Sequence, residues 1–483
     1  MNLKILLSSN KNIYILFSFI LGCFFSLSFE PYNIPFFSVI IVGLFFMVND
    51  KIHNVFGRDY KLMFNTGLFF GFGFFITSIY WITNSIFEFD PNLSYLTPFP
   101  LLVLPLLLGV FYGLMQMINA ILWNNNISRI FFFSSSWIFF EILRSTILTG
   151  FPWNLIAYSW SWSISYMQSL SLFGVFGLGL FTVFCASGIF SFRPKKYNFL
   201  ISIFSIIILG ILFFFGHNRI SNYTDVYSNT DQIRLVSTNF NRKEKLTNES
   251  FKKMKSLGSE DIITIFPESS FGSHKVNHAN WFSGIIRNDG IKYYNSVIYN
   301  GRVYDKRKLV PFGEFIPLQK FLKKIGLNNF LPMESFSEGD KEINFDTSLV
   351  PLICYEGVFP NFTRKSIQKN SKLLVNVTSD AWFGSGAGPK QHFTHVRYRT
   401  IENGLSLARS ANKGITALVN PIGQIIESIP YNSLDYIDIK VPDKINKTIY
   451  NSYGDKIVFF LIVLFLLIGY STLKFSMNKL EYE

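Results

Sequence analysis

The chain has 483 residues, of which 49% are hydrophobic and 56 are phenylalanine, and this is too apolar for an ordinary soluble protein. Its formal net charge is +13, but the basic residues lie in short segments between apolar runs and do not form one block. This distribution argues against a nucleic-acid partner and favours a protein embedded in a membrane.

Eight apolar runs are long enough, or nearly long enough, to cross a bilayer as a helix, which takes about 20 residues. They lie at 13–29, 34–48, 62–83, 98–123, 130–148, 166–190, 198–215 and 457–473. Between the last two runs, charged residues are mixed with alternating strands and turn signals. The sequence therefore predicts a membrane bundle of seven spans at 1–216, one extramembrane domain at 217–455, and a last span with a tail at 456–483.

The short loops predict how the spans are oriented. If eight spans alternate, the loops near 30–35, 84–97 and 149–165 contain no lysine or arginine, and the loops on the opposite side contain many. Positively charged loops stay in the cytoplasm, so both termini are expected inside and the 217–455 domain outside. The basic residues on the inner side are Lys4, Lys11, Lys51, Arg58, Lys61, Arg129, Arg193, Lys195, Lys196, Lys474 and Lys479.

Two charged residues, Glu141 and Arg144, interrupt the fifth run near its outer end, just before Thr149-Gly150-Phe151-Pro152-Trp153. Their spacing of three positions places them on one face of a helix. They could be a mutually neutralised pair that anchors helices, or they could hold a lipid headgroup. Charges are scarce elsewhere in the runs, which argues against an ion or proton pathway.

In the extramembrane domain, three short apolar strands each end in a polar group. Residues 262–267 lead into Glu268, residues 349–353 into Cys354, and residues 373–377 into Ser379-Asp380. A fourth segment, 304–310, carries Lys306. Because catalytic groups often gather at the carboxyl ends of adjacent strands, a carboxylate, an ammonium and a thiol are expected to converge.

Such a set suits acyl transfer, because a thiol needs a base to take its proton and the tetrahedral intermediate needs donors for its oxyanion. Glu268 can be the base, and Lys306 with the backbone N–H of Tyr355 can be the donors. Singly, each group has a plainer explanation: a lone cysteine in an apolar strand is usually a core residue, and a glutamate after proline is usually solvated.

The other two cysteines, Cys23 and Cys185, lie in apolar runs. The three cysteines therefore fit neither a metal-binding spacing nor a disulfide framework. The sequence predicts no metal and no cofactor.

Three tripeptides carry a resemblance to a known superfamily. Phe266-Pro267-Glu268, Tyr304-Asp305-Lys306 and Cys354-Tyr355-Glu356 resemble the three catalytic motifs of the nitrilase superfamily. Within it, residues 309–314 and the stretches 376–384 and 388–392, combined with a membrane bundle, resemble the apolipoprotein N-acyltransferase family. The resemblance extends over nearly the whole chain, including 149–153 and 409–414.

The resemblance implies a polytopic α-helical membrane bundle of about eight spans joined to an α+β, four-layer αββα nitrilase-like domain. It implies an enzyme that takes a fatty acyl group from a phospholipid, with phosphatidylethanolamine as the expected donor. The acyl group then passes through a cysteine thioester to the α-amine of the diacylglyceryl-cysteine of an apolipoprotein. The expected location is the bacterial cytoplasmic (inner) membrane, with the catalytic domain on the periplasmic side.

By the same resemblance, Glu268 is the general base, Lys306 the oxyanion lysine and Cys354 the nucleophile. Supporting roles are expected for Glu314, Tyr355, Glu356 and Asn295. Substrate contacts are expected from Trp382, Phe383, His392, Glu141 and Arg144. The glycines Gly384, Gly386 and Gly388 and the apolar stretch 312–331 are candidates for mobile flaps, although tight turns explain the glycines equally well.

The sequence departs from the family at the edge of the pocket and not at the reacting groups. Phe266 stands where tryptophan is usual, and Ser237-Thr238-Asn239-Phe240 stands where a glutamine-containing motif is usual. Two rival functions remain: a membrane-tethered carbon–nitrogen amide hydrolase, in which water resolves the thioester, and a transporter or scaffold that carries an inactive domain.

Overall fold

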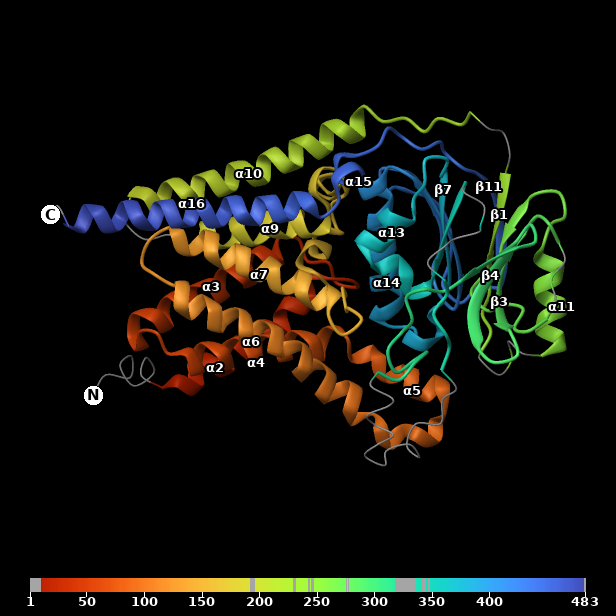
Figure 1. The fold of residues 1–483 in the computed structure, drawn as a ribbon, viewed down its shortest axis with the longest axis horizontal. Helices are drawn as coiled ribbons and strands as arrows, with labels where there is room; N and C mark the ends of the chain where they lie inside the picture. The colour runs from red at the N-terminus through yellow and green to blue at the C-terminus, as the bar shows by residue number, and fades with distance from the viewer. Residues whose placement is uncertain are drawn as a thin grey trace. The chain divides into compact units, whose positions relative to one another are not determined.

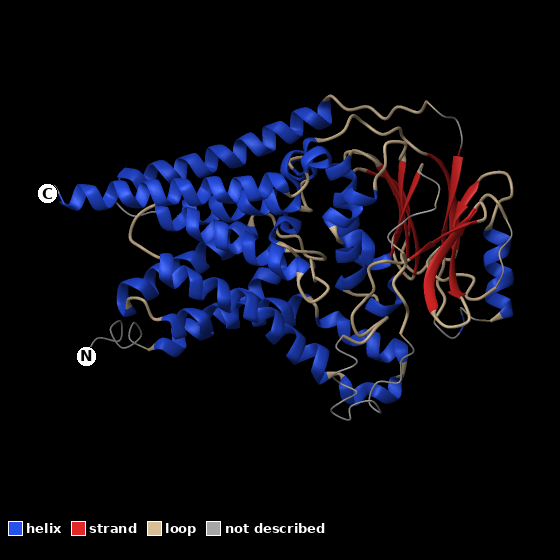
Figure 2. Cartoon of the chain, in the orientation of Figure 1, coloured by secondary structure: helices blue, strands red, loops and turns tan. Residues whose placement is uncertain are grey.

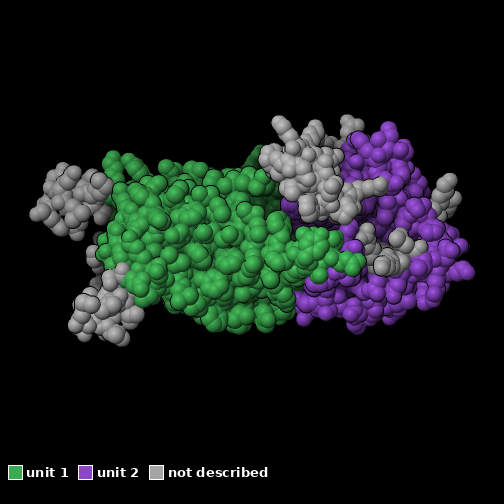
Figure 3. All heavy atoms as spheres, turned by 90° about the horizontal axis from the view of Figure 1, so that it is seen from below, with its two compact units in different colours: residues 1–83, 92–223, 448–483 green, residues 84–91, 224–447 purple. Residues whose placement is uncertain are grey.

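The computed structural model describes residues 10–191, 196–228 and 232–481, except for 242, 243, 245, 246, 275, 277, 318–334, 341–344, 346 and 347. The chain forms two compact units (Figure 3). The membrane unit consists of 1–83, 92–223 and 448–483, and the sheet unit consists of 84–91 and 224–447. The sheet unit therefore begins and ends a few residues inside the predicted 217–455, and it also takes up 84–91, which the sequence placed in a loop between spans.

Each of the eight predicted apolar runs forms a helix of the membrane unit (Figure 1). These helices are α2 (Lys11–Phe25), α3 (Phe37–Phe56), α4 (Tyr60–Ser78), α6 (Leu104–Leu122), α7 (Ser128–Thr146), α9 (Leu170–Phe190), α10 (Lys196–Ser221) and α16 (Lys456–Glu481). Shorter helices are α8 (Ile164–Met167) and α15 (Ile449–Tyr453).

The polytopic helical bundle is confirmed; within the described part of the chain, six or seven of its helical stretches are by themselves long and apolar enough to cross a membrane. Six helical stretches are long and apolar enough to cross a membrane, and Tyr60–Ser78 with Tyr80–Phe89 adds a seventh if this bent pair is one span. Helix α7 is not among them, because it carries Arg129, Glu141 and Arg144.

Glycines allow α4 and α6 to approach each other closely. A Cβ added to Gly67 would lie 2.3 Å from the carbonyl oxygen of Tyr112, and one added to Gly71 would lie 2.7 Å from Cα of Gly109. In lipid, helices gain little from hiding apolar side chains from one another, so their association depends on such close packing.

The sheet unit contains two sheets. The first has the order β11-β1-β2-β3-β4-β5, in which β1, β2 and β3 are parallel. The second has the order β10-β9-β8-β7-β6, in which β6, β7 and β8 are parallel. The strands are β1 (Gln232–Ser237), β2 (Ile263–Ile265), β3 (Trp281–Asn288), β4 (Tyr293–Tyr299), β5 (Arg302–Asp305), β6 (Leu349–Ile353), β7 (Leu373–Ser379), β8 (Ser406–Asn412), β9 (Thr416–Val419), β10 (Ile425–Ile429) and β11 (Asp435–Lys440).

Helices cover the outer faces of the two sheets, which gives four layers (Figure 2). Apolar residues of both sheets, such as Leu235 and Val375, form the core between them. Helix α11 (Asn248–Leu257) packs on the first sheet through Met254, and α14 (Ala387–Asn403) packs on the second through Val396. Among its described residues, the unit also forms α5 (Asn84–Phe89) and α13 (Pro360–Ser366). The predicted αββα domain is confirmed.

Candidate active site

Four polar side chains form a buried network beside β2, β4 and β5. The ammonium nitrogen of Lys306 lies 2.8 Å from Glu314 Oε1 and 3.5 Å from Glu268 Oε1. The amide nitrogen of Asn295 donates to both carboxylates, at 2.7 Å to Glu268 and 2.9 Å to Glu314. The structure thus brings together four of the residues for which the sequence predicted a role in catalysis.

The β4–β5 hairpin and the second sheet hold this network in place. In the hairpin, Ser296 pairs with Asp305, and the N–H of Lys306 donates to the carbonyl oxygen of Asn295 at 2.8 Å. From the other sheet, the N–H of Ser379 at the end of β7 donates to Glu268 Oε2 at 2.8 Å. One oxygen of Glu268 therefore faces the lysine and the other is bound by the second sheet.

Lys306 remains a cation although it is 1% exposed. Burial alone lowers its pKa, but the carboxylates of Glu314 and Glu268 outweigh this effect and hold the pKa above its usual value. An ammonium fixed in this way is already oriented before a reaction begins, which is what stabilisation of an oxyanion requires.

Cys354 stands where β6 turns into the 3-10 turn Cys354–Val358 (η8), and its φ of +50° places it in the left-handed region. Burial raises the pKa of its thiol; Glu268 adds to this effect, and Lys306 and a hydrogen bond with the Thr378 side chain oppose it. The resting group is therefore a thiol, and it can attack an acyl carbonyl only when a base accepts its proton.

Glu356 connects the turn that contains Cys354 to the segment around Lys306. Its Oε2 accepts from the N–H of Ile353 at 2.8 Å. Its Oε1 accepts from the Tyr304 hydroxyl at 2.9 Å and from the N–H of Arg307 at 2.7 Å. Burial raises the pKa of Glu356, whereas these hydrogen bonds favour the carboxylate. Glu356 thus connects the segments before Cys354 and after Lys306. The neighbouring Tyr355 is buried, with its ring packed edge-on against Phe359.

A second buried cluster lies on the other side of the nucleophile. Asp380 Oδ1 lies 2.8 Å from His392 Nδ1, and His392 Nε2 lies 3.3 Å from the carbonyl oxygen of Cys354. The ring of Phe383 packs edge-on against His392, with 5.4 Å between centroids. Trp382 and Phe383 are half-buried, and His392 is fully buried.

Sequence reasoning missed part of this second cluster. Asn376, Thr378 and Asp380 occupy every second position of β7 and its extension, and all are fully buried. Arg409 of β8 joins Asp380, with Nη2 at 2.8 Å from Oδ2. The signal was present in the sequence: three polar residues at a spacing of two inside an apolar strand predict one polar buried face.

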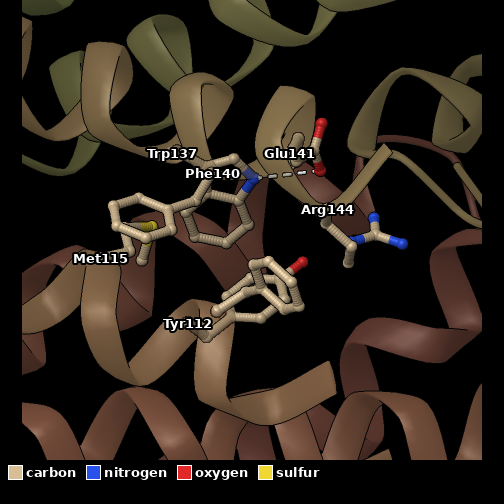
Figure 4. Close-up of a pocket in the computed structure, with 7 residues that line it drawn as sticks. Tyr112, Met115, Trp137, Phe140, Glu141 and Arg144 are labelled. Atoms are coloured by element: carbon tan, nitrogen blue, oxygen red, sulfur yellow. Dashed lines mark hydrogen bonds between the residues drawn. The ribbon is translucent and has the colours of Figure 1, made fainter. Parts of the chain in front are cut away.

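In the membrane unit, Glu141 and Arg144 line one small pocket (Figure 4). Both also bind the chain segment that follows α7. Glu141 Oε1 accepts from the N–H of Ile156 at 2.9 Å and from Trp137 Nε1 at 3.2 Å. Arg144 Nη1 donates to the carbonyl oxygens of Phe151 and Trp153, at 2.6 and 2.9 Å. The adjoining cavity of about 10 Å³ has room for roughly one water molecule and not for a headgroup, which supports the anchoring alternative.

Two further sequence predictions are reached only in part by the described residues. Of the candidate flap 312–331, positions 318–331 lie outside them. Gly384 has a φ of +68°, which a tight turn explains. Within the described ranges, no three His, Cys, Asp or Glu side chains are grouped so that they could hold a metal ion.

Comparison with known proteins covers both units. The family model for the apolipoprotein N-acyltransferase N-terminal domain matches residues 21–188, and the carbon-nitrogen hydrolase model matches residues 263–450. The apolipoprotein N-acyltransferases of Rickettsia bellii and Rickettsia prowazekii are each 31% identical to this chain, over 86% of it and 90% of their own length. A mutant of a Nesterenkonia amidase from the nitrilase superfamily aligns with 46% of this chain and 94% of its own at 14% identity, with a TM-score of 0.33.

Proposed function

The chain belongs to the apolipoprotein N-acyltransferase family, and we propose that Cys354, Glu268 and Lys306 carry out its reaction. The protein is an acyltransferase of the bacterial inner membrane that acts on lipid and lipoprotein substrates. The observation that carries the residue assignment is the buried network in which Lys306 and Asn295 bind Glu268 beside the Cys354 thiol.

In the first half-reaction, Glu268 takes the proton of the Cys354 thiol, and the sulfur attacks the ester carbonyl carbon of a phospholipid. Lys306 and the N–H of Tyr355 stabilise the oxyanion that forms. When the intermediate collapses, the carbon–oxygen ester bond breaks, Glu268 returns the proton to the leaving alkoxide, and lysophospholipid departs. The acyl group stays on Cys354 as a thioester.

In the second half-reaction, the α-amine of a diacylglyceryl-cysteine attacks the thioester. Glu268 accepts a proton from the attacking nitrogen, the carbon–sulfur bond breaks, and the thiolate takes that proton. The product is an amide.

The proposed donor is phosphatidylethanolamine. Drawing a chain of about 16 carbons fully into water would cost roughly 13 kcal/mol at about 0.8 kcal/mol per CH₂, so the enzyme must meet its lipids at the membrane.

This mechanism predicts a stalled acyl-enzyme when no acceptor is present. The purified protein with phospholipid alone should release about one equivalent of lysophospholipid and keep a hydroxylamine-sensitive acyl group on Cys354, because a ping-pong enzyme waits for its second substrate. Intact-protein mass spectrometry would detect the adduct. A diacylglyceryl peptide with a free amine should discharge it, whereas the N-acetylated peptide should not. Continuous release of free fatty acid without any peptide would instead identify a membrane-tethered hydrolase.

We also propose that both termini are cytoplasmic and that the 217–455 domain is periplasmic, from the one-sided distribution of Lys and Arg in the short loops. A cysteine introduced as Ser256→Cys, at an exposed position of α11, should react with an impermeant maleimide added to spheroplasts. The matched Asn54→Cys variant, exposed near the end of α3, should react only after permeabilisation. The reverse pattern would invert the orientation.

A further inference from the structure

His392 lies inside the sheet unit and contacts the backbone of Cys354. It belongs to α14 and is 0% exposed. Nε2 lies 3.3 Å from the carbonyl oxygen of Cys354. Nδ1 lies 2.8 Å from Asp380 Oδ1 and 3.2 Å from Arg409 Nη2. A side chain with both nitrogens engaged inside the protein cannot reach a lipid, but it can orient the backbone that it contacts.

The imidazole ring of His392 lies next to buried polar side chains that are themselves hydrogen-bonded. Asp380 is fully buried, accepts from the Thr378 hydroxyl at 3.0 Å and pairs with Arg409 at 2.8 Å. Arg409 also donates to Asn376 Oδ1. Burial raises the pKa of Asp380, but Arg409 and His392 outweigh burial and keep it below its usual value. Burial lowers the pKa of His392, so the neutral ring carries one proton. Arg409 Nη2, which is bound to the Asp380 carboxylate, lies 3.2 Å from Nδ1 and can donate to it, which leaves the proton on Nε2.

The backbone of Cys354 needs such support. Its φ of +50° is unfavourable for a residue with a Cβ, and such a conformation persists only when the surroundings enforce it. Glu356 binds the N–H of Ile353 just before the cysteine. On the carbonyl side, His392 Nε2 is nearer to the oxygen than the amide of Asn376, which lies at 3.5 Å.

We propose that His392 is a positioning residue: the ring carries its proton on Nε2, which donates to the carbonyl oxygen of Cys354, while Arg409, fixed by Asp380, donates to Nδ1, and this network holds the nucleophile in its left-handed turn. The proposal rests on the proposed role of Cys354 as the acylated residue. His392 acts through Cys354 and touches neither substrate.

Two substitutions of His392 distinguish the role of Nε2 from that of Nδ1. The amide of His392→Gln can place an N–H where Nε2 lies, whereas that of His392→Asn replaces only the Nδ1 side. We expect Gln to keep the kcat of acyl-enzyme formation within about fivefold of the wild type and Asn to lower it about 100-fold, the scale on which small misplacements act. The KM for phospholipid should change in neither variant. His395→Gln, another buried histidine of α14, is the control for loss of a histidine from this helix.

The outcomes distinguish this proposal from the proposed function. If the wild type forms no adduct on Cys354, the proposed function fails, and the positioning role that rests on it is overturned with it. The positioning role is overturned if the wild type forms the adduct and His392→Asn acylates as fast as the wild type. It is also overturned if the kcat of acyl-enzyme formation is higher in His392→Asn than in His392→Gln. Should both variants unfold, wild-type protein labelled with ¹³C-carbonyl cysteine and ¹⁵N-histidine decides the matter by solid-state NMR. The histidine nitrogen coupled to a cysteine carbonyl must carry a proton, and an unprotonated nitrogen there refutes the proposal.

Discussion

The Cys354→Ala variant is expected to lose both lysophospholipid release and transfer to lipoprotein, by a factor on the order of a million, because no other group can take over as nucleophile. The loss should not come from misfolding. Alanine keeps a Cβ at the position with φ +50°, so the strain of the turn is unchanged, and only the sulfur with its hydrogen bond to Thr378 is removed. Radiolabelled phospholipid turnover in proteoliposomes measures the effect.

Cys23→Ala is the matched control, because Cys23 is a half-buried cysteine in α2 of the membrane unit. Turnover of this variant should equal that of the wild type, and the thermal unfolding of both variants should stay within a few degrees of it. Residual turnover of Cys354→Ala above a thousandth of the wild-type rate would show that the acyl group does not pass through this thiol.

The Glu268→Gln variant should slow acylation by about 10³-fold, within the range that general base catalysis contributes. Two effects act together. The amide cannot accept the thiol proton, and its NH₂ group must face either the Ser379 N–H or the Asn295 and Lys306 donors, all of which now point at a carboxylate oxygen. Burst kinetics of lysophospholipid release measure the acylation step directly.

Glu249→Gln provides the comparison, because this exposed carboxylate of α11 belongs to the same unit and its loss should leave the burst unchanged. A wild-type burst in Glu268→Gln would remove Glu268 from the mechanism. Since the nucleophile, base and lysine act as one unit, adding Glu268→Gln to Cys354→Ala should cost almost nothing further.

The sequence was informative wherever the evidence was local. Apolar runs the length of a bilayer predicted the eight helices, because a span must satisfy its backbone groups within one continuous segment. Strands that end in Cys354 and Ser379-Asp380 predicted a convergence of polar groups, because β6 and β7 are adjacent parallel strands that end at the same edge of a sheet. Glu268 follows a strand of the other sheet, and the packing of the two sheets brings it to Ser379. Asn295 and Glu314 were predicted as supporting residues from the resemblance. In the structure, Asn295 donates to Glu268, and Glu314 pairs with Lys306.

The sequence by itself thus determined the class of the protein, its family and the residues of its proposed chemistry. The tertiary structure decided which side chains share a contact across long separations. Only the fold shows that Glu141 and Arg144 both bind the 151–156 segment, that 84–91 belongs to the sheet unit, and that His392 contacts the carbonyl oxygen of Cys354. The physical reason is that buried polar groups must find partners wherever the packing of distant elements supplies them, and no local pattern encodes which partner that will be.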